Sequence, residues 1–257
     1  MDKFLPEELL TEIYHDTLQP SFQEASKTIS FIPRVINHLL SKLDFYLLKS
    51  EYQKKELIIS LENRLKSVEE SKLVAPEPFV AIPALNAYSY SMDNQTLKNL
   101  YVNLLANAMN IDTKEFVHPA YVEIIKQMSP NDALVLNEIN KMVNLPILQA
   151  IAVDKAEFYT FQTLLSDISI LENLNININM IRFFLANLNR LGLIELNRDA
   201  NISEYESLYK KIESNGIVQN IIATTNIDIK DYEIKFVRGY AALTPFGENF
   251  MSICYSD

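Results

Sequence analysis

Residues 118–136 read HPAYVEIIKQMSPNDALVL and contain two helix starts in close succession. The first has a histidine at the cap position and a proline at the first helical position, where a missing N–H is harmless. The second is an approximate capping box, in which a serine caps the helix and an aspartate replaces the usual glutamate. Two helices therefore meet at a sharp joint. The residues of the two starts are His118, Pro119, Ser129, Pro130 and Asp132.

The joint divides the chain into a helical bundle, 1–128, and a second domain, 129–257. In the bundle, the stretch from about 35 to 72 has no Pro or Gly, and its apolar residues recur at intervals of three and four. This pattern predicts one long helix. Such a helix must pack along another helix of the bundle or along another subunit, and we expect a homo-oligomer that forms through 35–72. A shorter amphipathic helix is predicted over 7–19.

A proline-rich stretch, LVAPEPFVAIPALNAYSY at 73–90, follows the long helix. Its prolines are Pro76, Pro78 and Pro83. Proline lacks the N–H that a helix interior needs, and its ring clashes with the preceding turn, so a long regular helix through 76–83 is excluded. The many apolar residues indicate that this strap packs onto the bundle and is not a solvated linker.

The next helix is predicted from a cap at Asp93 to Met109. Asn103 and Asn107 are four residues apart and therefore share one face of this helix. We expect their amides to hydrogen-bond to the strap or to the turn at His118. For His118 itself we expect capping and packing, because no motif around it marks a serine, cysteine or carboxylate partner.

After the joint, the order of elements is typical of a winged-helix domain with an enlarged hairpin. Gly192 is placed to end the third helix, because glycine is favoured just after a helix. The sequence therefore predicts a mainly α fold, in which a helical bundle with one long helix precedes a winged-helix-like α+β domain. The expected elements of the second domain are helices at 130–143, 156–172 and 177–191, a strand at 193–196, a helix at 202–213, strands at 217–225, 232–238 and 240–243, and a last helix from Pro245 to about Cys254, capped by Thr244.

The block 73–133 resembles the abortive-infection alpha (Abi-alpha) family of bacterial proteins. The matching pieces are LVAPEPFVAIPAL, TLKNLYVNLLANAM and HPAYVEIIKQMSPNDALVL, which are specific as an ensemble. The resemblance implies a role in phage defence, in which infected cells stop growing before phage mature. It implies no chemistry, because the family has no defined catalytic residues. The positions that carry the motif, expected to serve structure or interaction, are Pro76, Pro78, Asn103, Asn107, His118, Pro119, Ser129, Pro130 and Asp132.

The composition excludes several classes of active site. With four glycines, none closer than eight residues to the next, the chain has neither a phosphate-binding loop nor a dinucleotide fingerprint. Its single cysteine and three scattered histidines do not form a zinc motif. We therefore expect no catalytic, cofactor or metal site, although an enzyme whose acids come from distant parts of the chain stays open. No segment reads as a membrane span or signal peptide, which predicts a cytoplasmic protein.

Charge argues against DNA as the partner. The chain has a net charge of −10, and residues 151–257 alone carry nine basic and fourteen acidic residues. DNA affinity depends mainly on neutralising phosphates. We therefore expect a phage-defence protein that binds an unknown host or phage protein. The alternative is a winged-helix transcriptional regulator whose bundle dimerises or senses a ligand. Its DNA contacts would be Asn179, Arg182, Arg190, Lys230, Lys235 and Arg238.

Overall fold

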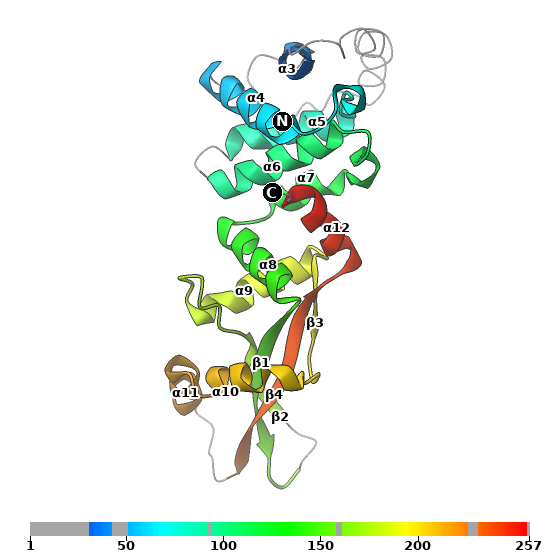
Figure 1. Cartoon of the computed structure of the whole chain (residues 1–257). Helices are drawn as coiled ribbons and strands as arrows, with labels where there is room; N and C mark the ends of the chain where they lie inside the picture. Colours follow the sequence, from blue (N-terminus) through cyan, green and yellow to red (C-terminus); the bar gives the residue numbers. More distant parts are fainter. Residues whose placement is uncertain (1–30, 43–50, 92–93, 158–160, 226–230, 256–257) are drawn as a thin grey trace. The chain divides into compact units, whose positions relative to one another are not determined.

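The computed structural model describes residues 31–42, 51–91, 94–157, 161–225 and 231–255. Helices predominate among them, and the predicted mainly α fold is confirmed, together with a four-stranded antiparallel sheet (Figure 1). The chain divides into two compact units. The first contains the described residues up to Met128 and those from Asn249 onward, and the second is Ser129–Glu248. The prediction had assigned the last residues of the chain to the second domain.

The first unit is a helical bundle built around α6. The middle of α6 is buried on all sides, from Leu100 through Ala106, as expected of a helix at the centre of a core. Helices α4, α5 and α7 pack against it. The elements of this unit are α3 (Phe31–Lys42), α4 (Glu51–Leu65), η2 (Glu70–Lys72), α5 (Pro78–Tyr90), α6 (Gln95–Ala108), η3 (Lys114–Phe116), α7 (Ala120–Lys126) and the later part of α12 (Pro245–Cys254).

The long helix predicted over 35–72 is wrong at its C-terminal end. Helix α4 ends at Leu65, and only the short η2 follows before the proline-rich stretch. Whether the helix continues between α3 and α4 concerns residues 43–50, which lie outside the described residues, as does the helix predicted over 7–19.

The strap predicted at 73–90 is largely a helix, α5, so its exclusion from helix is also wrong. Pro78 opens α5, where proline is favoured, but Pro83 lies inside it. The carbonyl that loses its donor to Pro83 belongs to Phe79. Burial of one face, including Val80 and Leu85, offsets the loss. In the next helix, α6, the cap is Asn94 and not Asp93.

The second unit combines helices α8 to α11 with a sheet in the order β2-β1-β4-β3. Strands β1 and β4 pair along their whole length, from Asn144 opposite Ala242 to Asp154 opposite Tyr232. Helix α10 crosses one face of this sheet (Figure 1). The elements are α8 (Pro130–Met142), β1 (Asn144–Asp154), β2 (Phe161–Ile168), α9 (Ile178–Arg190), β3 (Ile194–Asn197), η4 (Ser203–Tyr205), α10 (Glu206–Glu213), α11 (Gly216–Ala223), β4 (Tyr232–Leu243) and the start of α12.

An ion pair joins the two edges of the sheet. Arg198, which follows β3, donates to Asp167 of β2 through Nε at 2.9 Å and Nη2 at 2.8 Å. Because β2 and β3 lie at opposite ends of the strand order, the sheet must curl for these side chains to meet. Gly239 of β4 lies directly against the backbone of Asn197, where a Cβ atom would have no room.

Two elements predicted for the second unit are wrong. The predicted helix at 156–172 is the strand β2 with its flanking residues, and the predicted strand at 217–225 is α11. Among the described residues of the second unit, α8 and α9 are the helices that precede β3. The order predicted for a winged-helix domain has three helices there. Thr244 caps α12 as predicted, because its Oγ1 accepts from the N–H of Gly247 at 2.9 Å. Gly192 ends α9 with φ of +73°, also as predicted.

Candidate functional site

Two asparagines of the family-like block hold the end of α12 within the first unit. Asn103 donates from Nδ2 to the carbonyl of Cys254 at 2.8 Å, and Asn107 donates to the carbonyl of Ile253 at 2.8 Å. The last carbonyls of a helix lack donors within the helix, so these amides act as side-chain caps. These two contacts go to α12, whereas the predicted partners were the strap or the turn at His118. The Oδ1 atom of Asn103 is buried and has no hydrogen-bond partner.

The turn before α7 is organised by His118. Its Nδ1 accepts from the N–H of Ala120 at 3.1 Å, and its ring lies 5.9 Å from the ring of Tyr121. His118 and Pro119 are both exposed. The imidazole therefore accepts from an N–H at the start of α7, although the cap position is occupied by Pro119, one residue later than predicted.

Tyr121 and Asn249 connect α7 to α12, and the sequence patterns single out neither. Tyr121 is fully buried, its hydroxyl accepts from the amide of Asn249, and burial raises its pKa. Asn249 also donates to the carbonyl of Phe116 at 2.8 Å. The ring of Phe250 meets Tyr121 edge to face at 5.2 Å. The sequence gives little indication of this contact, because Asn249 lies 128 residues from Tyr121 along the chain.

The predicted capping box at the joint is present in the second unit. The N–H of Ser129 donates to Asp132 at 2.7 Å, and the N–H of Asp132 donates to Ser129 Oγ at 3.2 Å. Pro130 occupies the first helical position. Asp132 is only 3% exposed, so its carboxylate serves the helix start and is closed to solvent. Pro76 and Pro78, the remaining positions of the motif, are both buried.

One thiol and one phenol of the first unit are buried and held in their protonated forms. Cys254 is buried, and burial raises the pKa of its thiol, which keeps it in the unreactive protonated form. Burial likewise raises the pKa of Tyr88 to about 12. Within the described ranges, no set of His, Cys, Asp and Glu side chains is grouped so that it could hold a metal ion. None of the described helices has the length and apolarity to span a membrane.

Helix α9 is the predicted recognition helix, and its inward face is as predicted. Ile178, Ile181, Leu185 and Leu188 are all buried. Its outward face includes two apolar side chains that the DNA alternative does not list: Phe183, 54% exposed, and Met180, 44% exposed. The helical periodicity that places the four buried residues on the inward face also places Phe183 on the outward face. The exposure of Phe183 could therefore have been predicted from the sequence.

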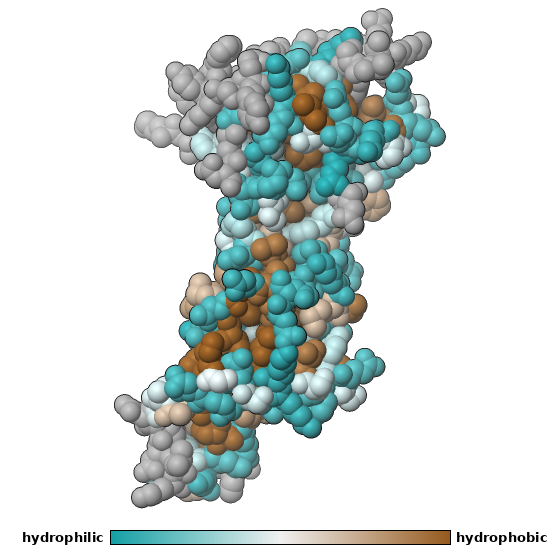
Figure 2. Space-filling model, turned by 60° about the vertical axis from the view of Figure 1, so that its left-hand side comes forward, coloured by the Kyte–Doolittle hydropathy of each residue, from teal (hydrophilic) through white to brown (hydrophobic). Residues whose placement is uncertain are grey.

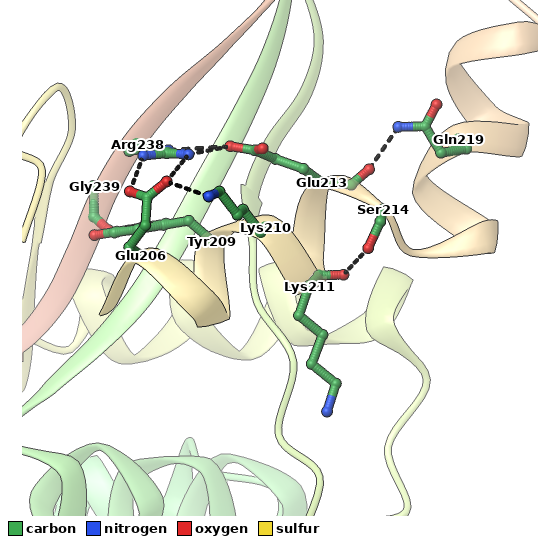
Figure 3. Close-up of polar contacts among 9 residues, drawn as sticks. All are labelled: Glu206, Tyr209, Lys210, Lys211, Glu213, Ser214, Gln219, Arg238 and Gly239. Atoms are coloured by element: carbon green, nitrogen blue, oxygen red, sulfur yellow. Dashed lines mark hydrogen bonds and ion pairs between the residues drawn. The ribbon is translucent and has the colours of Figure 1, made fainter. Parts of the chain in front are cut away.

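Both basic residues proposed to contact DNA from β4 are paired with carboxylates, and Figure 3 shows the pairs of Arg238. Arg238 donates to Glu206 at 2.6 Å and to Glu213 at 3.0 Å, which raises its pKa, and its guanidinium lies 5.2 Å from the ring centre of Tyr209. Lys235 lies 3.2 Å from a carboxylate oxygen of Glu233.

The other proposed contacts do not form a cationic stripe either. On α9, Arg190 donates to Asn187 at 2.8 Å, Arg182 lies over the ring of Phe183, and the side chain of Asn179 is partly buried. Lys230 lies outside the described residues.

Comparison with known proteins gives one family and one solved structure. The family model described as "Abortive infection alpha" matches residues 49–254. The solved structure is that of an uncharacterized protein from the hydrocarbon-degrading marine bacterium Alcanivorax borkumensis SK2. The alignment has 13% identity and a TM-score of 0.37, and it covers 54% of this chain and 96% of the other. No curated protein matches.

Proposed function

This chain belongs to the abortive infection alpha family, and on that premise we propose that it is a bacterial phage-defence protein that acts by binding another protein. The partner would be a host or phage protein met in the cytoplasm. The binding itself, and no catalytic step of this chain, would stop growth of the infected cell.

The use made of the polar groups in the family block supports this proposal. The amides of Asn103 and Asn107 donate to main-chain carbonyls, and Ser129 and Asp132 bond to each other across a helix start. His118 accepts from a main-chain N–H. Each of these contacts stabilises the fold, which supports a structural role for these side chains and a partner-binding surface outside them. This observation carries the proposal.

Self-association through 35–72 remains a prediction. The leucines of α4 that form its apolar stripe, Leu57, Leu61 and Leu65, are buried inside the first unit. Of the described large apolar side chains of α4, Ile59 is exposed, with 57% of its surface accessible. An oligomer formed through α4 would therefore use the face that carries Ile59. Size-exclusion chromatography with light scattering, with and without duplex DNA at low salt, measures this directly.

The test is phage challenge of bacteria that express the intact chain. We expect fewer plaques and an early arrest of infected cultures, compared with cells that carry an empty vector. The matched variant is His118→Ala, which removes the exposed imidazole and costs one capping hydrogen bond. Since the proposed role of His118 is structural, this variant should keep its circular dichroism spectrum and its protection. A folded His118→Ala protein that fails to protect would contradict the non-catalytic proposal, and absence of protection by the intact chain would contradict the defence role.

A further inference from the structure

We infer that the outward face of α9 is a docking surface for an acidic amphipathic helix of the partner protein. The face consists of Met180, Arg182, Phe183, Asn187 and Arg190. This inference rests on the proposed function, which requires a protein partner, and it adds where that partner binds and what chemistry it brings.

The exposure of this face distinguishes it from an ordinary solvated helix surface. Phe183 and Met180 are three residues apart on one side of α9 and are 54% and 44% exposed. Large apolar side chains that adjoin on a surface indicate an interaction site more often than single exposed ones do. Figure 2 shows hydrophobic residues gathered in the second unit at the level of α8 and α9.

The spacing of the face fits a helical partner. Met180, Phe183 and Asn187 follow one another at intervals of three and four, so they form a ridge along the axis of α9. From Met180 to Arg190 this ridge extends about 15 Å, at about 1.5 Å per residue. A partner helix that lies along such a ridge buries the phenylalanine ring between its own apolar side chains.

The charge of the face determines the charge of the partner. The guanidinium of Arg182 lies 4.9 Å from the ring centre of Phe183, so a cation and an apolar ring are presented together. Arg190 lies near the other end of the ridge, and α9 contains no carboxylate. On a chain with a net charge of −10, this helix is locally positive. A partner that places carboxylates beside apolar side chains therefore matches it.

The same charges disfavour the two other occupants. A second copy docked through α9 would bring its own arginines against Arg182 and Arg190, which repel. Duplex DNA requires several cations to neutralise phosphates, yet Arg238 and Lys235 are paired with carboxylates and Phe183 lies at the centre of the face.

The experiment measures binding of a labelled peptide to the intact chain by fluorescence polarisation. The probe is a helix-forming peptide with leucine on one face and glutamate on the other, and its control carries lysine in place of every glutamate. The test variants are Phe183→Ser and Arg190→Glu. The matched control is Phe79→Ser, since Phe79 is 53% exposed, almost the same as Phe183, but lies on α5 in the first unit.

We expect the glutamate probe to bind, Phe183→Ser to weaken it at least tenfold, and Arg190→Glu to weaken it several-fold. Phe79→Ser should bind like the unaltered chain, and the lysine probe should not bind. Failure of the glutamate probe, equal binding of the lysine probe, or an equal loss with Phe79→Ser would each overturn the inference. So would a dimer or a DNA complex that Phe183→Ser dissolves, because either result assigns the face to another occupant.

Phage challenge separates failure of this inference from failure of the proposed function. If the intact chain protects and folded Phe183→Ser protects equally well, α9 is not the docking surface, although the defence role stands. If the intact chain gives no protection, the defence role fails whatever the peptide does. Loss of protection with Phe183→Ser but not with Phe79→Ser supports both.

Discussion

Asn103 provides the sharpest test of how the family block works. Its side chain is 4% exposed, and its amide donates to the carbonyl of Cys254 at 2.8 Å. Asn103→Ala removes the donor and leaves that buried carbonyl unpaired, which costs about 1–3 kcal/mol. The buried Oδ1 atom of Asn103 has no partner in the native protein, so its removal recovers part of this loss. We expect a net destabilisation of about 1–2 kcal/mol.

Asn103→Asp should be worse than Asn103→Ala at neutral pH. It keeps the shape of the side chain but places a carboxylate against the carbonyl of Cys254, so a buried charge faces an acceptor, and the cost should exceed about 3 kcal/mol. Burial raises the pKa of the introduced carboxyl above its value in the unfolded chain. Stability should therefore recover as pH falls through this raised pKa, because the protonated acid can donate its O–H to the carbonyl.

The assay is hydrogen exchange of the amides of α6 and α12. Hydrogen exchange reports local free energies, so it follows the unit that contains Asn103 separately from the other unit. Asn107→Asp is the matched control, since Asn107 is partly exposed and a charge there should cost less. If Asn103→Asp were no less stable than Asn103→Ala at neutral pH, or if low pH brought no recovery, the carbonyl would not be the partner that matters.

Two further predictions concern the second unit. Val143, at the end of α8, has φ of 66° and is 71% exposed. Val143→Gly should therefore relieve backbone strain without loss of packing and stabilise the protein by about 1 kcal/mol in thermal melts. A destabilised Val143→Gly protein would contradict this expectation. The hydrogen bond from Arg238 lowers the pKa of Glu206 below its usual 4.5, so the pair stabilises the fold above that pH and loses its effect as pH falls through the lowered pKa. In Arg238→Met, urea melts should therefore depend less on acid pH, and an unchanged dependence would refute the pair's role.

Local signals in the sequence predict local structure correctly here. The capping box of Ser129 and Asp132 and the glycine that ends α9 depend on residues within one helical turn, and both are present. At Gly192 the N–H donates to the carbonyl of Asn189 at 3.0 Å, and the next N–H donates to Leu188 at 3.0 Å. These are the two bonds of a Schellman motif. Patterns of this kind need no knowledge of the rest of the chain.

Elements whose structure depends on distant partners were predicted wrongly. Strand β2 has apolar residues at spacings compatible with a helix, but Leu165 pairs with Ala150 and Ile168 with Leu148 in the sheet. The stretch of α11 is rich in Ile and Val, which favours strand, yet it is helical. Val218 of α11 belongs to the core that covers the sheet, and Asn215 caps the helix by accepting from Ile217 at 3.0 Å. Tertiary packing outweighs propensity in both segments.

The candidate site was predicted in part, for a related reason. The asparagines of α6 were singled out by their spacing, but the carbonyls that they bond belong to Ile253 and Cys254 at the far end of the chain, which no spacing rule could indicate. Phe183 was overlooked because a phenylalanine in an amphipathic helix is ordinarily assigned to the core. The periodicity that placed Ile181 and Leu185 inward is sufficient to place it outward.

These two groups of residues separate stability from recognition in a way that mutations can resolve. A change at Asn103 removes a buried hydrogen bond, so it should lower stability and reduce protection only as far as the folded population falls. A change at Phe183 removes a ring that is 54% exposed, so it should leave stability within about 0.5 kcal/mol of the unaltered chain while it removes binding. Measured on both variants, stability should fall mainly with the change at Asn103, and binding should fall mainly with the change at Phe183. A Phe183→Ser protein that lost stability and protection together would instead place its side chain within the core.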